Sequence, residues 1–277
     1  MRKGFFIVAL LLIVVLSACT APPATQPTAS APTATMQPVT LNVFAAASLT
    51  EAFSKLGAQF EAEHPGVTVV FNFAGSQQLA QQLADGAPAD VFASANQKQM
   101  DAVIASGRIA NDQALPFVTN QLVVILPKDN PAKLAALSDL AKPGLKLVLA
   151  AAEVPVGQYA LDFLDKATQD ATLGAAFKEA VLKNVVSYEA NVKAVLTKVV
   201  LGEADAGIVY GSDVSGDSAA AVQQVAIPAA LNVVASYPIG TVQNSTNPDS
   251  AAAFVAYLLS PAGQAMLAEF GFTPLEQ

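Results

Sequence analysis

The residues best suited to chemistry in this sequence are hydrogen-bond donors that follow apolar runs. Ser48, Ser76 and Tyr210 carry hydroxyl groups, and the loop at 154–157 offers backbone N–H groups beside Gly157. None of these residues forms an acid, base or nucleophile pair. A cluster of neutral donors can hold an anion through charge-assisted hydrogen bonds, so the pattern favours binding over catalysis. Ser94 follows a similar run, and its role stays open.

The stretch around Ser48 predicts a strand that leads directly into a helix. Leu41, Val43 and Phe44 form a nearly continuous apolar run, typical of a parallel strand buried on both faces. Ser48 stands where a helix N-cap belongs, and Glu51 follows at the spacing of a capping box. The N–H groups and dipole of such a helix start can also bind an anion. Taken alone, the stretch leaves the cap and the ligand role open.

Strands and helices alternate along the chain, which predicts an α/β fold with mainly parallel sheets. Such a sheet binds its ligand outside the carboxyl ends of its strands, where the candidate donors stand. The expected strands are 40–46, 67–73, a short one within 86–94, 120–127, 146–150, 206–210, 222–227 and 233–242, and the expected helices are 49–63, 77–84, 97–106, 158–169, 172–182, 191–201, 249–259 and 261–270.

Composition excludes several classes of function. The 277 residues are 53% hydrophobic, enough for one large or two modest domains. The net charge is −8 and the 14 Lys and Arg residues are scattered, which argues against binding to nucleic acid. A single Cys and a single His exclude an internal disulfide and a Cys/His metal site. His64 lies in a Glu-His-Pro-Gly turn, where a surface position is the simplest interpretation.

The N-terminal residues precede the fold. Arg2 and Lys3 stand before an apolar stretch at 5–16, which is short for a membrane span and typical of a signal peptide over residues 1–18. The sequence Leu16-Ser-Ala-Cys19 resembles a bacterial lipobox, so we expect cleavage before Cys19 and its lipidation. An ordinary signal peptide with an incidental cysteine is the alternative. Residues 19–38, rich in Thr, Pro and Ala, then form a tether.

Five ordered motifs, together with the closing helices, resemble the molybdate-binding proteins of ABC transporters, which are type II periplasmic binding proteins. The resemblance covers residues 40–272. The motifs are Phe44-Ala-Ala-Ala-Ser-Leu-Thr50, Phe73-Ala-Gly-Ser76, Gly86-Ala-Pro-Ala-Asp-Val-Phe-Ala-Ser-Ala95, Val154-Pro-Val-Gly-Gln-Tyr-Ala160 and Gly207-Ile-Val-Tyr-Gly-Ser-Asp213.

The resemblance implies a two-lobed α/β fold whose lobes are mainly parallel sheets flanked by helices, joined by two crossing hinge strands. Lobe 1 would comprise residues 39–121 and 238–277, and lobe 2 residues 122–237. An oxyanion would lie in the cleft. By motif, Ser48 and Ser76 would each donate a hydroxyl and a backbone N–H to the oxyanion. Val156 and Val192 would each donate a backbone N–H, and Tyr210 would donate its hydroxyl. The match at Val192 is the loosest.

Two departures from a pure donor site need interpretation. Gly75 stands where the family often has Ser, which changes little chemically because Ser76 aligns with the ligand residue. Asp90 lies within a motif, but an acid beside a dianion is repulsive, so we assign it to a loop or cap, and Asp213 to the surface or a cap. A site without a carboxylate disfavours a protonated anion, whose O–H would stay unpaired. Molybdate and sulfate differ in size, so the choice between them must come from the size of the cavity.

The sequence therefore predicts a monomeric, lipid-anchored binding protein on the extracytoplasmic face of the cell membrane. It would capture molybdate or tungstate without a further cofactor, close its lobes, and deliver the ion to an ABC permease. It would not be an enzyme. The alternatives are a receptor for sulfate or another oxyanion and, from other classes, an exported serine hydrolase or a structural surface lipoprotein.

Overall fold

This computed structural model describes residues 38–275, and the predicted signal peptide, Cys19 and tether up to residue 37 lie outside the described residues. The strands are β1 Val39–Ala46, β2 Val67–Ala74, β3 Val91–Ala93, β4 Leu115–Pro127, β5 Leu147–Ala150, β6 Val185–Glu189, β7 Ala206–Tyr210, β8 Val222–Ala226, β9 Val234–Thr241 and β10 Thr273–Pro274. The helices are α1 Thr50–Glu63, α2 Ser76–Ala84, α3 Gln97–Ala105, α4 Pro155–Ala167, α5 Phe177–Lys183, α6 Val192–Val200, α7 Asp217–Ala221, α8 Pro248–Leu259 and α9 Pro261–Glu269, with short 3-10 helices η1 Ala47–Leu49, η2 Asn111–Gln113, η3 Leu137–Ala141 and η4 Gly211–Asp213.

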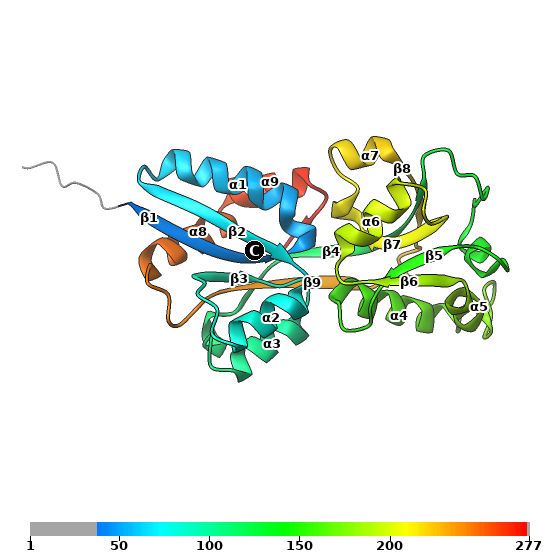
Figure 1. Cartoon of the computed structure of the whole chain (residues 1–277), viewed down its shortest axis with the longest axis horizontal. Helices are drawn as coiled ribbons and strands as arrows, with labels where there is room; N and C mark the ends of the chain where they lie inside the picture. Colours follow the sequence, from blue (N-terminus) through cyan, green and yellow to red (C-terminus); the bar gives the residue numbers. More distant parts are fainter. Residues whose placement is uncertain (1–37, 276–277) are drawn as a thin grey trace, which may run out of the picture. The chain divides into compact units, whose positions relative to one another are not determined.

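The strands join in one sheet with the order β2-β1-β3-β9-β4-β7-β5-β6, and β8 and β10 add to β4 (Figure 1). We call β2, β1 and β3 the first strand group, and β7, β5 and β6 the second strand group. Helices α1, α8 and α9 cover one face of the first group, and α2 and α3 cover the other. Helices α6 and α4 contact the second group from opposite faces.

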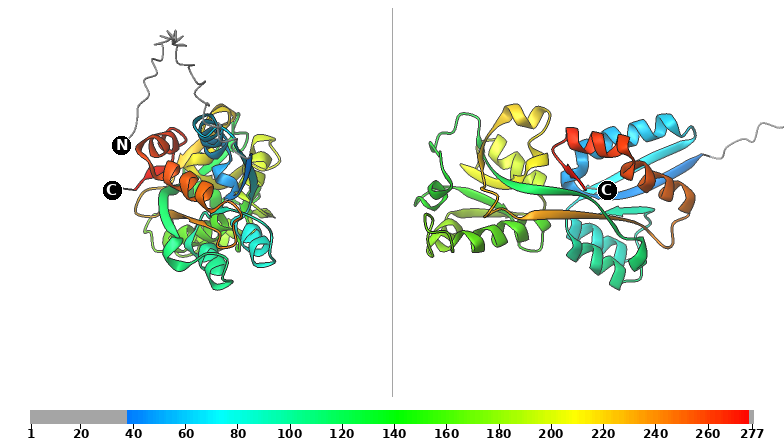
Figure 2. Two further views of the ribbon diagram at one scale, coloured as in Figure 1. Left: turned by 90° about the vertical axis from the view of Figure 1, so that its left-hand side faces the viewer. Right: turned by 180° about the vertical axis from the view of Figure 1, so that it is seen from behind.

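The long strand β4 changes partner along its length. Residues 115–121 pair with β9, whereas residues 122–125 pair with β7. Strand β9 in turn pairs with β3 through residues 239–241. The two strands therefore run from one strand group to the other, as Figure 1 and the right-hand view of Figure 2 show.

The sheet is mixed. The strands within each group are parallel, as expected, but every antiparallel pair among the described residues includes β4 or β9. The prediction of mainly parallel sheets is wrong for these long strands. A strand covered on both faces is a continuous apolar run whichever direction it takes, so its sequence does not reveal its sense.

Helix α5 and strand β6 are among the elements in which the structure differs from the sequence-based prediction. The helix expected over 172–182 begins only at Phe177, because Gly174 adopts a positive φ of 79° and the Asp170 carboxylate accepts the N–H groups of Thr172 and Leu173 in a turn. Strand β6 was not predicted at all. It lies at the end of the sheet, and its exposed Val186 and Tyr188 give it no apolar alternation pointing to a core.

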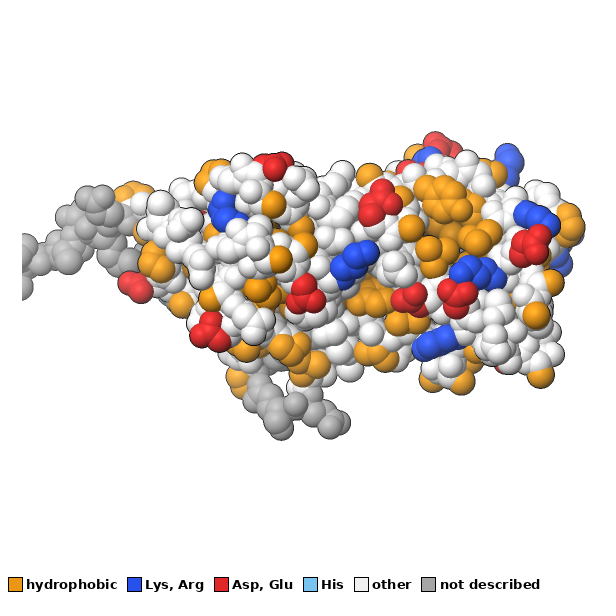
Figure 3. Space-filling model, turned by 90° about the horizontal axis from the view of Figure 1, so that it is seen from below, with side chains coloured by type: hydrophobic (Ala, Val, Ile, Leu, Met, Phe, Trp, Pro, Cys, Tyr) orange, Lys and Arg blue, Asp and Glu red, His pale blue; other side chains and the backbone are white. Residues whose placement is uncertain are grey.

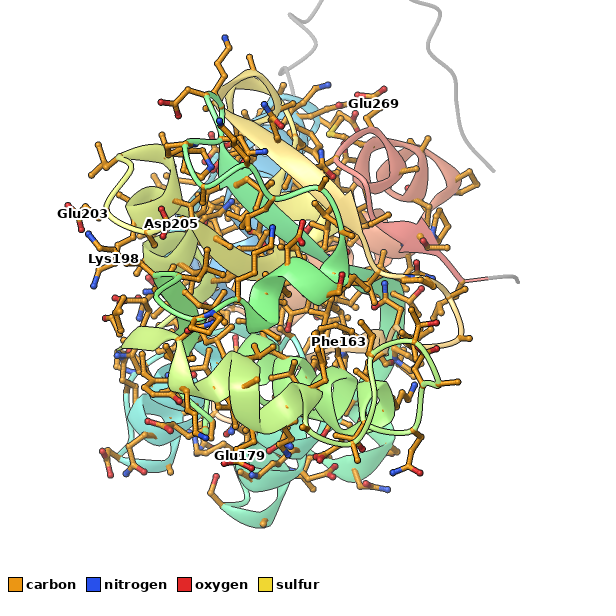
Figure 4. All side chains as sticks on the ribbon, turned by 90° about the vertical axis from the view of Figure 1, so that its right-hand side faces the viewer. Phe163, Glu179, Lys198, Glu203, Asp205 and Glu269 are labelled. Atoms are coloured by element: carbon orange, nitrogen blue, oxygen red, sulfur yellow. The ribbon has the colours of Figure 1, made fainter. Side chains whose placement is uncertain are left out.

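Aromatic side chains fill the core under the first strand group. Phe53, Phe60 and Phe254 are fully buried, and the ring of Phe254 meets the other two edge-on. Beside the second strand group, Phe163 of α4 is fully buried, while the labelled Glu179 and Glu203 lie at the periphery (Figure 4). On the face in Figure 3, Lys and Arg side chains are scattered among Asp and Glu.

No single helix between residues 38 and 275 is long and apolar enough to cross a membrane, although α8 and α9, bent by 63°, meet that length and composition as a pair.

Candidate ligand-binding site

A small cavity brings together all five residues that the sequence predicts as ligands. Ser48, Ser76, Val156, Val192 and Tyr210 line it, with contributions from both strand groups. The space that the centre of a water-sized sphere can occupy in this cavity is about 10 Å³. That is about the room one buried water needs. The site is therefore narrow, although Ser48, Ser76, Val156, Val192 and Tyr210 all reach it.

Ser48 lies in η1, between the end of β1 and the start of α1, and is buried. Its Oγ lies 2.9 Å from Tyr237 Oη. The predicted capping box is wrong, because neither η1 nor α1 has a side-chain cap. The 3-10 turn starts the helical path before Ser48, so its hydroxyl points inward. The Glu51 carboxylate instead binds the Lys193 ammonium at 2.7 Å.

Ser76 is the first residue of α2 and is buried. Its Oγ accepts the N–H of Ala95 at 3.0 Å, which leaves the Ser76 proton free to donate to a ligand. Helix capping falls to another residue, since the Gln78 side chain accepts the Gly75 N–H at 3.2 Å. Ser76 is thus at a helix start, as predicted, and its hydroxyl is not used as a cap.

Gly75 matters for space rather than for hydrogen bonding. A Cβ added there would stand 2.6 Å from the carbonyl oxygen of Ala190, which lies at the edge of the second strand group. The sequence-based view concerned the chemistry of Gly in place of Ser; the structure adds that a side chain at this position would meet the Ala190 carbonyl oxygen. The missing side chain lets the loop before α6 approach the start of α2.

Val156 and Val192 offer backbone N–H groups at two further helix starts. Pro155 opens α4, so Val156 is its second residue, and Val192 is the first residue of α6. N–H groups in a first turn have no intrahelical acceptor and carry the positive end of the helix dipole. A Cβ at Gly157 would stand 2.1 Å from the carbonyl oxygen of Ala151, so only glycine lets α4 start so close to β5.

Tyr210 is the last residue of β7 and is 1% exposed. Its hydroxyl has no hydrogen-bond partner among the described residues. An unpaired buried hydroxyl is costly, so its position facing the cavity points to a ligand as the missing partner. Burial raises the pKa of Tyr210 well above its ordinary value, which keeps the hydroxyl protonated and able to donate.

Charged groups stand next to the cavity but do not line it. Lys193 follows Val192 and lies 3.0 Å from Asp213 as well as 2.7 Å from Glu51. Burial lowers the pKa of Lys193, but Asp213 and Glu51 outweigh it and raise that pKa overall. Asp213 is buried, and its carboxylate accepts the Tyr210 N–H at 3.1 Å, which is the cap role expected for it.

The remaining sequence candidates stabilise loops outside the cavity lining. Ser94 Oγ donates to the Asn96 carbonyl at 2.8 Å, so its open role resolves into a turn before α3. Asp90 accepts the N–H of Asn42 at 2.7 Å, a loop function as expected. His64 stacks on Phe60 with ring centroids 3.9 Å apart. Between residues 38 and 275 no group of three His, Cys, Asp or Glu side chains could hold a bare metal ion.

Sequence reasoning missed Tyr237, whose hydroxyl holds Ser48 from behind. Tyr237 lies in β9, 189 positions from Ser48, and is fully buried. Within an apolar strand such a tyrosine is indistinguishable from an ordinary core residue, and no local pattern marks its partner. Only the chain fold brings the two hydroxyls together.

The site as a whole is a wall of neutral donors at four helix starts, with neither a carboxylate nor an ammonium group in its lining. Such a wall suits a small anion that carries only acceptors. A protein with a net charge of −8 must bind this anion through local dipoles, because its long-range field is unfavourable.

Comparison with known proteins gives consistent matches. A family model described as bacterial extracellular solute-binding protein matches residues 41–273. The molybdate-binding protein ModA of Mycobacterium tuberculosis is 42% identical over 230 residues, which covers 83% of each chain. A putative ABC transporter substrate-binding lipoprotein of Bacillus subtilis is 28% identical over 98% of each chain.

A solved structure, the substrate-binding domain of a putative molybdenum ABC transporter from Clostridium difficile, aligns with a TM-score of 0.64 and 32% identity. The alignment covers 86% of this chain and 100% of that chain.

Proposed function

The chain belongs to the bacterial extracellular solute-binding protein family, and from this premise we propose that it is the molybdate-binding substrate protein of an ABC transporter. Members of such a family bind solutes, so the chain is a binding protein and not an enzyme. The observation that carries the choice of ligand is the cavity lined by hydroxyl and N–H donors, in which the Tyr210 hydroxyl lacks a partner.

The protein groups that would bind the anion act as hydrogen-bond donors only. The hydroxyl groups of Ser48, Ser76 and Tyr210, with the N–H groups at the helix starts, would each donate to an oxygen of the anion. Hydrogen bonds to an ionised acceptor are roughly twice as strong as neutral ones. The helix dipoles add positive charge without a Lys or Arg, so a dianion would be held without a full counter-charge in the lining.

Selection among anions would follow from protonation and size. A hydrogen phosphate carries an O–H that needs an acceptor, and the lining has no carboxylate to provide one. Molybdate, tungstate and sulfate carry no such proton at neutral pH, so the cavity dimensions would separate sulfate from the two larger anions. Tungstate would fit nearly as well as molybdate.

We further propose a two-lobed arrangement that opens and closes about β4 and β9. The lobes would comprise residues 39–121 with 238–277, and residues 122–237, because β4 changes partner from β9 to β7 between Gln121 and Leu122. Ser48 and Ser76 would belong to lobe 1, and the other proposed ligands to lobe 2. Because the proposed ligand residues of both lobes are buried, the anion would need hinge opening to enter.

Three direct contacts between the proposed lobes that do not involve the hinge strands β4 and β9 favour the closed state. Glu51 pairs with Lys193 at 2.7 Å. The Gln77 side chain donates to the Ala190 carbonyl at 2.9 Å. The Gln99 side chain donates to the Glu153 carbonyl at 3.3 Å. These contacts would break on opening, and an anion bound to both lobes would offset their loss.

The mature protein would be held to the extracytoplasmic face of the membrane by a lipid on Cys19, followed by the 19–38 tether. The lipoprotein name of the Bacillus subtilis relative, which matches 98% of this chain, supports this proposal. The bound anion would pass to the permease subunits of an ABC transporter, and the protein would act as a monomer.

A thermal-shift series tests the proposed function. At a concentration of a hundred times Kd, a ligand adds about 2.7 kcal/mol to the free energy of unfolding. For a domain of this size that raises Tm by about 5–10 °C. We expect this shift with molybdate and tungstate but not with phosphate. An equal shift with sulfate would favour the general oxyanion receptor. No shift with any anion would favour a structural lipoprotein. A measurable hydrolytic turnover that is lost in His64→Ala would favour a hydrolase.

A further inference from the structure

Tyr237 stands directly behind a proposed ligand without lining the cavity itself. Its Oη lies 2.9 Å from Ser48 Oγ, and Ser48 separates it from the space that the anion would occupy. The side chain is fully buried. Its hydroxyl therefore reaches the ligand only through Ser48.

The ring of Tyr237 is fixed by three aromatic neighbours. Its centroid lies 6.4 Å from that of Phe117, 5.7 Å from Tyr210 and 5.5 Å from Phe272, each approaching edge-on or nearly so. These rings come from β4, β7 and the segment after α9. Because the ring is packed on several sides, the position of the hydroxyl is set by the core and does not adjust to Ser48.

The direction of the Ser48–Tyr237 hydrogen bond decides whether Ser48 can bind an anion. If Ser48 donated to Tyr237, it would present only a lone pair to the cavity, and an oxyanion would be repelled. If Tyr237 donates, the Ser48 proton is free to point at the anion. Burial raises the pKa of Tyr237 well above its ordinary value, so its hydroxyl retains the proton it must donate.

Ser76 provides the parallel on the same side of the cavity. Its oxygen accepts a backbone N–H, that of Ala95 at 3.0 Å, so its own proton is also left for the ligand. If Tyr237 is the donor in its pair with Ser48, both serines receive one hydrogen bond from behind. For Ser76 the donor is the main chain, and for Ser48 it is a side chain that mutation can remove.

We propose that Tyr237 is a positioning residue of the anion site, which donates to Ser48 Oγ and so directs the Ser48 proton towards the bound oxyanion. This inference rests on the proposed function, since it needs an oxyanion in the cavity. It extends that function to a residue outside the lining and links the aromatic core to the affinity of the site.

The test is a double-mutant cycle measured by titration calorimetry. Tyr237→Phe keeps the ring and removes only the hydroxyl. We expect it to weaken molybdate binding about 2- to 12-fold, the range for one hydrogen bond. In a Ser48→Ala background the same change should alter Kd by less than about twofold, because two residues that act as a unit are not additive. Weak binding by the Ser48→Ala proteins is followed as a thermal shift over millimolar anion.

Tyr257→Phe is the matched control. Its hydroxyl is also buried, but it has no hydrogen-bond partner among the described residues, and Tyr257 lies in α8 outside the cavity lining. We expect its Kd to equal that of the wild type. A general effect of removing a buried hydroxyl would weaken binding in this variant too.

Each outcome bears on one of the two proposals. An unchanged Kd in Tyr237→Phe, or the same fold loss with and without Ser48, would overturn the positioning role. The proteins are titrated with molybdate and with sulfate. The preference of the wild type reports on the proposed function, and the ratios among variants, with whichever anion binds, report on Tyr237. A wild type that binds neither anion would overturn both.

Discussion

The Glu51 carboxylate lies 2.7 Å from the Lys193 ammonium, although the two residues are 142 positions apart. Glu51 follows the proposed ligand Ser48 in the first turn of α1, and Lys193 follows the proposed ligand Val192 in α6. The ion pair therefore joins the two walls of the cavity beside the proposed anion. Asp213, buried on the Lys193 side, is the third member of the cluster.

Glu51→Gln should shorten the lifetime of the closed state. The pair is partly exposed, with 23% of the Lys193 and 41% of the Glu51 side chain accessible, so its contribution is modest. Such pairs contribute about 0.2–1 kcal/mol, which corresponds to a release of molybdate up to about fivefold faster. When molybdate release is followed by stopped flow at increasing salt concentration, the release rates of the wild type and the variant should converge, because salt screens the ion pair. A salt-independent difference would contradict this role.

Lys193→Met should destabilise the whole protein, unlike Glu51→Gln. Removing Lys193 leaves the fully buried Asp213 side chain without its cation. Breaking a buried pair from one side typically costs about 3–5 kcal/mol. Thermal unfolding without ligand should show the loss. Lys178→Met, which breaks the more exposed pair with Asp165, serves as control and should leave Tm nearly unchanged.

Gly75→Val should impair closure without unfolding the protein. The added Cβ would meet the Ala190 carbonyl oxygen at 2.6 Å, but the φ of −60° and ψ of 136° at Gly75 suit any residue. We expect molybdate to bind at least about tenfold more weakly, mainly through faster release. The Tm of the ligand-free protein should stay within a few degrees of the wild type. Wild-type affinity would show that the loop before α6 yields easily.

Binding and stability should both persist through mildly alkaline pH. Burial raises the pKa values of Tyr210 and Tyr237 above the ordinary 10.0, so both hydroxyls stay protonated there. A pKa raised by folding stabilises the protein fully below the unfolded value, and this stability is lost as the pH rises through the folded value. We expect a constant Kd from pH 7 to about 10 and a falling Tm above that. In Tyr210→Phe the alkaline loss should be smaller.

The strand and helix pattern predicted Ser48, Ser76, the 154–157 loop and Tyr210 as candidates, because each follows a strand or opens a helix at one edge of an α/β sheet. The resemblance to molybdate-binding proteins singled out Val156 within the loop and added Val192. The sequence did not predict what holds them. Glu51 has the spacing of a capping residue, yet it pairs across the cavity with Lys193. Local spacing describes hydrogen bonds within a turn, whereas this ion pair depends on the approach of two distant helices.

The same limit explains the errors in the sheet. The apolar run within β4 predicts a strand but neither its antiparallel sense nor its change of partner after Gln121. The short β6 lies at the end of the sheet with Val186 and Tyr188 exposed, so burial leaves little pattern there. Tyr237 reads as core from sequence because its function depends on a contact with Ser48.

The most direct test is a crystal structure of the protein with molybdate, using anomalous scattering at the molybdenum absorption edge. The proposed function predicts one strong molybdenum peak in the cavity, with the oxygens of the anion within hydrogen-bonding distance of Ser48 Oγ, Ser76 Oγ and Tyr210 Oη. The peak should be lost when Ser48 and Ser76 are both changed to Ala. A peak elsewhere on the protein, or none in crystals grown with saturating molybdate, would contradict it.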